Sequence, residues 1–425
     1  MKLLFKRIGI SIALIIVCVF IVQFYQDYKL TQPDKNDKNS LMMNHSTISG
    51  YQDGKRTWTI LVKEIIARDS QYFFSGNTLH SGKIFDGNGL VVVDNMQAEE
   101  VNVNSKSKTL SAKGHILAEF IKRDIVVPGG VQAYESRDKP VKIKADELRY
   151  FSTNKRTYLY SNVVIGQGNA RIYTQSVEVD NDKNIAYIDG AFTMKYDDMV
   201  VSGNQMVIYI DEEYSEILGK VRGYRNATPT KNKTLDERER TLKSQKTSLE
   251  CDYLKYESGN KNEVVTLKGH LLISQKDKNL KADSGLYDRN NDSFFVEGNI
   301  RFQSQSLAWL LRAQNREKLK NKDIKAAITM PTDLTCTRML FDSKNKIIKI
   351  VGDIRITQKD KVLTCQQLEF DDKTSLLGIT GNTKFVREKK DTLTADELLV
   401  NLDKEEFSAL SQVQTEFRIK KKSKE

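Results

Sequence analysis

The sequence has little proline, cysteine, histidine or tryptophan: 5, 4, 4 and 2 residues respectively in a chain of 425. So few prolines exclude collagen-like and proline-rich linker architectures. The few scattered cysteines exclude a cysteine-rich scaffold. Wholesale disorder is also excluded, because 39% apolar residues and 23 glycines bring the chain close to the globular average. The net charge of +11 bears on acidic partners more than on the fold.

Motifs of the common catalytic sites are missing as well. The sequence contains no Gly-x-Ser-x-Gly elbow, no His-Glu-x-x-His helix and no phosphate-binding loop. His115 and His270 each follow a glycine, where other copies of the same motif carry Asn or Asp, so we interpret them as turn residues. We therefore predict no catalytic residue, no metal site and no cofactor.

The N-terminus predicts a membrane anchor. Residues 8–22 carry no charge, and Lys2, Lys6 and Arg7 precede them, which predicts a cytoplasmic N-terminus and an exported body. A cleaved signal peptide would need small residues at its cleavage site, and residues 23–28 have none, so a retained anchor over 1–28 is favoured. Residues 29–50 are predicted to form a flexible tether. The residues expected to lie in the bilayer are Ile8, Ile12, Leu14, Ile15, Ile16, Val17, Val19 and Phe20.

Two short motifs alternate along the rest of the chain. The first is a small residue, a polar residue, any residue, a Leu-like residue, any residue, and an aromatic or aliphatic residue; Ala145 to Tyr150 is a clear copy. The second is Gly, then Asn, Asp or His, then alternating apolar residues, as from Gly298 to Phe302. Consecutive glycine positions lie 29 residues apart, for example from Gly190 to Gly219. Such regular spacing is the signature of a repeat architecture.

The period predicts an all-β fold. Alternation with period two indicates strands with one apolar face, and the Gly-Asn and Gly-Asp pairs are interpreted as turns leading into a strand. Each repeat of about 29 residues is then two strands, joined by turns such as residues 180–184. One hairpin cannot bury its apolar face, so the repeats must stack into an elongated ladder with a continuous apolar interior.

Interruptions of the 29-residue period define the expected domain boundaries. β-Repeats are predicted over 51–125, 140–225 and 248–420, with a charged insertion at 226–247 and a basic tail at 421–425. A third break runs from Trp309 to Ala327. It fits either a helix or a decayed repeat with Ala326, Ile328 and Met330 facing inward, and we favour the decayed repeat.

Three cysteines stand at the small-residue position of the first motif. Cys251, Cys336 and Cys365 replace the alanine found in other copies, which favours simple packing. Cys336 and Cys365 are one repeat apart and could lie on neighbouring strands, so a disulfide in an oxidising compartment stays open.

The anchor and the two motifs at this period resemble the OstA-like family of periplasmic lipopolysaccharide-export proteins, LptA and LptC, over about residues 58–419. The Trp58 region and the single anchor look like the LptC branch, which makes 51–125 LptC-like, whereas the copies around Gly381 and Ala395 look like LptA. The resemblance implies an elongated, twisted, semi-open β-jellyroll whose interior carries the acyl chains of lipid A. It also implies an inner-membrane ABC transporter that supplies the lipid, and other OstA-like bridge proteins that dock by β-augmentation. The chain departs from the family in being much longer than a typical inner-membrane member.

Inward positions two and four residues after each glycine site are the candidates for a lipid groove, although an ordinary closed core fits the same pattern. They are Ile116, Val163, Ile165, Phe192, Met194, Leu271, Ile273, Ile300, Phe302, Ile354, Ile356 and Phe385.

The sequence thus predicts a membrane-anchored periplasmic protein that transfers lipopolysaccharide and is not an enzyme. One alternative is a structural cell-envelope repeat protein without lipid cargo. Another is an envelope enzyme on a β-helix scaffold, which would need a unique cluster of charged residues, whereas the acidic residues here recur in many repeats. Nucleic-acid binding is not predicted, because no aromatic residues interleave with outward-facing basic ones such as Arg301 and Arg355.

Overall fold

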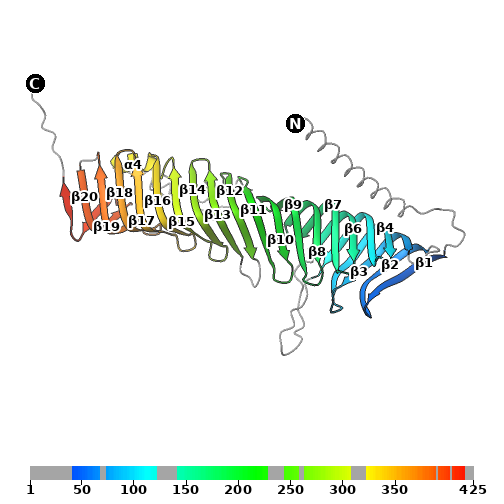
Figure 1. Cartoon of the computed structure of the whole chain (residues 1–425). Coiled ribbons are helices and arrows are strands. Elements are labelled where there is room, and N and C mark those ends of the chain that lie inside the picture. The colour runs from blue at the N-terminus through cyan, green and yellow to red at the C-terminus, as the bar shows by residue number, and fades with distance from the viewer. Residues whose placement is uncertain are drawn as a thin grey trace, which may run out of the picture.

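The body of the protein is one long β-sheet, as the computed structural model in Figure 1 shows. The structure describes residues 41–67, 73–121, 141–227, 244–257, 263–307, 322–388, 391–402 and 404–416. Within these ranges the strands follow one another along the molecule from β1 at one end to β20 at the other (Figure 1).

The first eleven strands are β1 Leu41–Gln52, β2 Lys55–Ala67, β3 Phe73–Phe85, β4 Val91–Asn104, β5 Thr109–Phe120, β6 Val141–Phe151, β7 Arg156–Gln167, β8 Ala170–Asp180, β9 Ile185–Tyr196, β10 Met199–Tyr209 and β11 Tyr214–Arg225. The remaining elements are β12 Thr247–Glu257, β13 Val264–Gln275, β14 Lys278–Asp288, β15 Ser293–Ser304, α4 Lys322–Thr329, β16 Thr332–Asp342, β17 Ile347–Gln358, β18 Lys361–Asp371, β19 Leu376–Arg387, β20 Asp391–Asn401, β21 Glu406–Leu410 and β22 Gln414–Glu416.

Each strand pairs antiparallel with the next strand in the sequence. β14, for example, pairs with β13 on one side and with β15 on the other, and β20 carries both β21 and β22 on its far edge. One 29-residue repeat is therefore one pair of strands, and the all-β prediction is confirmed. Among the described residues, α4 is the one helix.

The glycine motif bends the strands in their middle. In β15 the backbone is left-handed at Gly298 (φ 78°) and again at Asn299 (φ 43°), and the register with β14 and with β16 shifts at this point. The predicted turn leading into a strand is therefore wrong. A two-residue left-handed segment inside a paired strand is a bulge, and a bulge bends the strand instead of ending it. We call each such bend a corner.

The polar residue of the first motif holds the corner of the neighbouring strand. Asn299 Nδ2 donates to Asp283 Oδ2 over 2.7 Å, and His270 Nδ1 lies 2.6 Å from Asp252 Oδ2. The recurring acidic residues therefore have the structural role that their repetition predicts. The constant distance in sequence between the two motifs follows, because each polar residue must reach the residue after the glycine.

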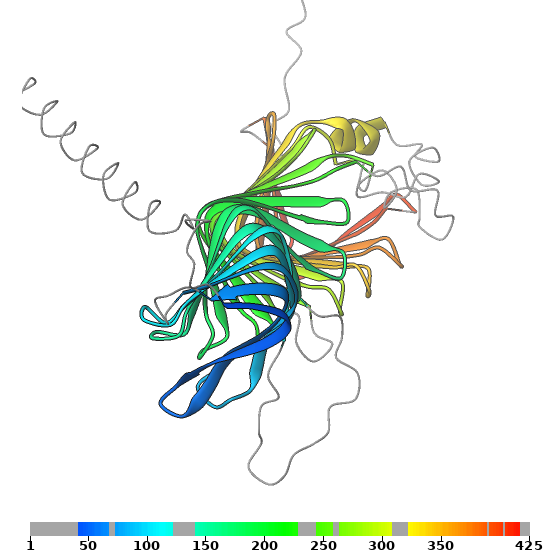
Figure 2. The same ribbon diagram turned by 90° about the vertical axis from the view of Figure 1, so that its right-hand side faces the viewer.

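Bending turns the sheet into a trough. Viewed at 90° to Figure 1, the strands curve around a common interior (Figure 2). One cluster of buried apolar side chains runs through this interior from Trp58 in β2 to Leu398 in β20, so the predicted continuous apolar interior is confirmed.

Two further expectations are corrected. The last part of the predicted tether, from Leu41 onward, forms the edge strand β1. Residues 322–329 form α4 instead of a decayed repeat, in keeping with the good helix formers Lys and Ala there. The rest of that break, 308–321, lies outside the described residues, as does most of the charged insertion at 226–247.

The possible disulfide is also excluded. Cys336 lies on β16 and Cys365 on β18, with β17 between them, and both thiols are free. Two strand spacings amount to roughly 9.5 Å, whereas a disulfide needs Cα atoms within about 7 Å of each other.

Candidate functional site

The trough is the candidate functional site, and the predicted inward residues lie along it. Eight of the twelve belong to the buried cluster: Ile116, Val163, Ile165, Phe192, Leu271, Ile300, Phe302 and Ile354. Met194, Ile273 and Ile356 are half-buried and pack against the cluster, and Phe385 is also half-buried. Eleven of the twelve positions therefore lie in the buried cluster or against it, although their burial is not uniform.

Burial falls from the corner toward the strand ends in the second half of the chain. Leu271, two residues after its corner glycine, is 1% exposed, whereas Ile273 is half-buried. Ile354 and Ile356 differ in the same way. The corner is thus the floor of the trough, and the apolar side chains nearer the strand ends are accessible to solvent.

Two sections of the trough differ in this respect. Among the described residues, 17 apolar side chains of β2–β8 are at most 1% exposed, against five in β9–β21. Conversely, 15 half-buried apolar side chains pack against the core in β9–β21, against three before β9. We call β2–β8 the closed section and β9–β21 the open section. The open section holds more strands but far fewer fully buried side chains, so its interior is only partly filled.

Contacts between the two long rims of the trough explain why the interior of the closed section is more deeply buried. The first rim consists of the turns that follow even-numbered strands, and the second rim of the turns that follow odd-numbered strands. Thr57 Oγ1, near the β1–β2 turn on the second rim, donates to Ser152 Oγ on the first rim over 3.4 Å. Gly87 N donates to Asp182 Oδ1 over 2.7 Å, and Asp182 also pairs with Lys155.

Two further hydrogen bonds extend this seam. Asn184 Nδ2, on the first rim, donates to the carbonyl oxygen of Ile121 on the second rim over 3.3 Å. Arg289 Nη1, in the β14–β15 turn, donates to Tyr196 Oη at the end of β9 over 3.1 Å. The partners are 63 to 95 residues apart in sequence. They join turns three to five strands apart in the ladder, so the rims meet across the trough.

Burial favours the uncharged form of the three cysteines and of Tyr150 in the trough. Burial raises the pKa of the thiols of Cys251 and Cys365 to about 11 and that of Cys336 to about 12. Burial, helped by the negative charge of Asp182, also raises the pKa of Tyr150 in the closed section. An apolar lining with these uncharged groups is suited to apolar ligands. Within the described ranges, no group of three or more His, Cys, Asp or Glu could hold a metal ion.

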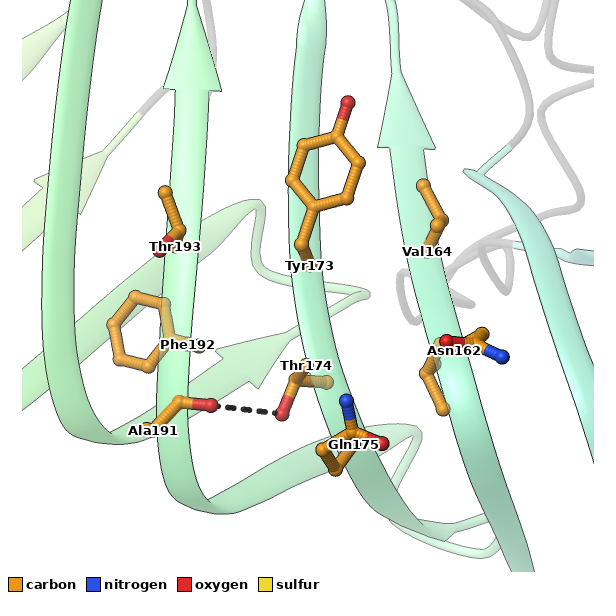
Figure 3. Close-up of a pocket in the computed structure, with 9 residues that line it drawn as sticks. Asn162, Val164, Tyr173, Thr174, Gln175, Ala191, Phe192 and Thr193 are labelled. Carbon is orange, nitrogen blue, oxygen red and sulfur yellow. Dashed lines mark hydrogen bonds between the residues drawn. The ribbon is translucent and has the colours of Figure 1, made fainter.

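One corner departs from the pattern. A pocket of about 390 Å³ lies where β7, β8 and β9 bend, and Figure 3 shows Tyr173, Phe192 and Val164 around it. Here the residue after Gly190 is Ala191, which has no polar side chain to bind Gln175. The register between β8 and β9 is broken from Thr174 to Glu178, and Thr174 Oγ1 donates instead to the carbonyl oxygen of Ala191 over 3.3 Å (Figure 3). The corner of β9 is therefore looser than its neighbours.

Sequence reasoning missed the seam. Its residues are Thr57, Gly87, Ile121, Ser152, Asp182, Asn184, Tyr196 and Arg289. The repeat reports which strands are neighbours, whereas the seam joins strands several repeats apart. The polar turn at 180–184 is visible in the sequence, but its complete burial at Asn181 and Asn184 is not.

The predicted anchor lies in residues 1–40, outside the described residues. In the part of the chain that is described, no helix has both the length and the apolar character needed to cross a bilayer.

Residues 125–226 match the family model described as LptC, lipopolysaccharide-assembly, LptC-related. The match covers β6–β11 and agrees with the resemblance to the OstA-like LptC–LptA family that the repeats predict. A crystal structure of LptH from Pseudomonas aeruginosa is also similar. LptH is described as the LptA homologous periplasmic component of the conserved lipopolysaccharide transport device, and it is 9% identical over 28% of this chain and 71% of its own, with a TM-score of 0.20. No curated protein sequence matches this chain.

Proposed function

We propose that this chain, which carries an LptC-related segment, is a membrane-anchored periplasmic lipid-transfer protein. It receives lipopolysaccharide from an inner-membrane ABC transporter and passes it along the apolar trough toward the outer membrane. The chemistry is transfer by binding, with no catalytic residue.

The half-buried apolar layer of the open section carries this proposal. Fifteen side chains, among them Ile273, Phe294 and Ile356, keep part of their apolar surface in contact with solvent, and they come from eleven of the thirteen strands β9–β21. A folded chain normally buries such surface, and large exposed apolar patches mark binding sites. A row that runs the length of the section fits long, flexible hydrocarbon chains better than a compact ligand.

The expected affinity is sufficient for transfer. Each buried CH₂ group contributes about 0.8 kcal/mol, so a few carbon atoms of each acyl chain already give substantial binding. Because this attraction is non-directional and is similar at each step of a continuous apolar row, a lipid can move along it without a large barrier.

The proposal also covers the partners. β1 and β21–β22 are the two edges of the sheet, and both expose apolar side chains, including Leu41 and Met42 at one end and Phe407 at the other. Edge strands with free backbone groups can accept a further strand. We expect the N-terminal anchor to hold the chain beside the transporter and other OstA-like bridge proteins to dock at the C-terminal edge.

Photo-crosslinking tests the cargo. A photoreactive residue at Ile356, which is half-buried and faces inward, should form an adduct with lipopolysaccharide on illumination. The same residue at the neighbouring Arg355, which is exposed and faces outward, is the matched control and should not. If Ile356, Phe302 and the other inward positions all fail to form adducts, the protein is a structural repeat protein without lipid cargo.

Depletion in cells tests the pathway. Loss of the protein should leave newly made lipopolysaccharide at the inner membrane. An unchanged distribution between the two membranes would contradict the transport role even if the purified protein bound lipid.

A further inference from the structure

We propose that the lipid path begins at β9, that Tyr196 and Arg289 form its upstream end, and that the closed section carries no cargo. This inference rests on the proposed function, and it fixes where along the chain an acyl chain can bind.

The packed interior of the closed section, away from the pocket at the corner of β9, has no room for an acyl chain. Its inward side chains, such as Ile143, Leu148 and Leu159, are at most 1% exposed. Protein interiors of this kind are packed as densely as organic crystals. Lipid could enter only if the rims separated.

Separating the rims of the closed section is unfavourable. Thr57, Ser152 and Asn184 are at most 3% exposed, so opening the seam would break hydrogen bonds between buried polar groups. Asn184 also donates to Asp211 Oδ1 over 2.6 Å, and this bond ties the seam to the β10–β11 turn. Leaving such groups without partners costs about 1–3 kcal/mol for each group.

The last contact of the seam is different. Arg289 has a side chain that is 50% exposed, and it is shared between Tyr196 and Glu263. A hydrogen bond of this kind is screened by water and opens easily. The buried contacts of the seam, Thr57 with Ser152 and Asn184 with Ile121, therefore give way to an exposed and breakable contact at the end of β9.

Two other observations place the boundary on the same strand. Met194 and Val201, at the end of β9 and the start of β10, are the first of the fifteen half-buried side chains of the open section. The loose corner at Gly190 and Ala191 also lies on β9. Burial, seam and corner geometry thus change together at one strand of the ladder.

Mapping a photoreactive lipid on the unmodified full-length protein tests the boundary. A lipopolysaccharide or lipid A carrying a diazirine in an acyl chain is bound and illuminated, and the labelled peptides are identified by mass spectrometry. We expect adducts in β9–β21 and none in β2–β8. Adducts inside β2–β8 would overturn the boundary while supporting lipid binding. No adduct anywhere would overturn both the boundary and the proposed function.

The Tyr196→Phe variant tests the upstream end. It removes the hydroxyl that Arg289 binds and keeps the aromatic ring. We expect labelling of the peptide that contains Met194 and Val201 to rise about two- to tenfold, the factor that corresponds to losing one exposed hydrogen bond. Labelling of β6–β8 should not change.

Tyr224→Phe is the matched control, because Tyr224 lies on β11, is 39% exposed and takes no part in the seam. Equal labelling in both variants and the wild type would show that Tyr196 and Arg289 do not form the end of the path. Spread of labelling into β6–β8 in Tyr196→Phe would show that this contact alone, and not the buried seam, keeps lipid out.

Discussion

The closed and open sections are built from the same repeat, yet one fills its interior and the other does not. Tyr150 and Tyr256 occupy the same position of the first motif; Tyr150 is fully buried in the closed section, whereas Tyr256 is half-buried in the open section. The corners are alike, with His115 and Glu99 in one section arranged as His270 and Asp252 in the other. The sections differ at the rims, where the closed section has buried contacts across the trough.

The difference shows that a repeat can be used for two purposes. A ladder of bent strands is a binding trough when its rims stay apart and an ordinary core when they meet. The rim contacts involve a few polar residues in turns, so a small number of side chains decides which form a stretch of sheet takes. The closed section then provides a rigid base for the open one.

The largest expected difference between the sections is the loss of stability on replacing Tyr150 or Tyr256. Tyr150→Ala should lower the free energy of unfolding by about 3–5 kcal/mol, because it leaves a large cavity in a packed interior and removes the hydroxyl beside Thr57 and Ser152. Tyr256→Ala should cost about 1–2 kcal/mol, because water already reaches that side chain. Urea denaturation followed by circular dichroism measures both, with hydrogen exchange to show which strands open. Equal losses would mean that the sections are packed alike.

Substitutions at the corner glycines should destabilise the closed and the open section by similar amounts. Gly114→Ala and Gly298→Ala each place a Cβ on a residue with φ 78° and against an acidic side chain, Glu99 or Asp283. A left-handed conformation costs a residue with a Cβ about 1–2 kcal/mol, so both variants should lose a similar amount of stability. Ser161, which occupies the same position with φ 60°, shows that the fold tolerates such a residue.

The Gly219→Ala variant is the control for the steric part, because no atom lies within 4 Å of a Cβ built there. It should cost less than the other two, as a thermal unfolding series would show. A clearly larger loss for Gly114→Ala than for Gly298→Ala would place part of the difference between the sections at the corners.

The corners show which features of the structure the sequence predicts and which it does not. The period of 29 residues predicts the strand pairs, their inward faces and the recurrence of the acidic residues, since all of these depend on neighbours in the ladder. It did not distinguish a bend within a strand from a turn before one, because Gly-Asn pairs suit both. It also could not separate Ile165, which is 6% exposed, from the half-buried Ile356, since their burial depends on rims that meet or stay apart over several repeats.

The difference in burial between Ile165 and Ile356 predicts a difference in chemical reactivity, an effect of intermediate size. In a background with Cys18, Cys251, Cys336 and Cys365 replaced by Ala, Ile356→Cys should react with a maleimide about tenfold faster than Ile165→Cys, which must wait for local opening. Alanine is a suitable replacement at the last three sites, because other copies of the motif carry it there, as at Ala145. Bound lipopolysaccharide should slow the reaction at position 356 and leave position 165 unchanged. Protection at position 165 alone would reverse the assignment of the two sections.

The smallest effect concerns pH and the corner of β13. The hydrogen bond to Asp252, together with its negative charge, raises the pKa of His270. The charged pair therefore contributes its full stability below the unfolded pKa of about 6.5, and this contribution is lost as pH rises through the higher folded pKa. The effect is small because the His270 side chain is 92% exposed and water screens the pair.

His270→Asn should remove this pH dependence, because the amide at the same position of another repeat, Asn299, donates to its acidic partner without titrating. If the open section unfolds before the closed one, the change between about pH 5.5 and about pH 8, which lie on either side of the unfolded pKa, should appear in the first thermal transition alone. A change confined to the second transition would mean that β13 unfolds with the closed section. The rim contacts would then stabilise more of the ladder than the strands they join, and the boundary at β9 would separate binding properties without separating folding units.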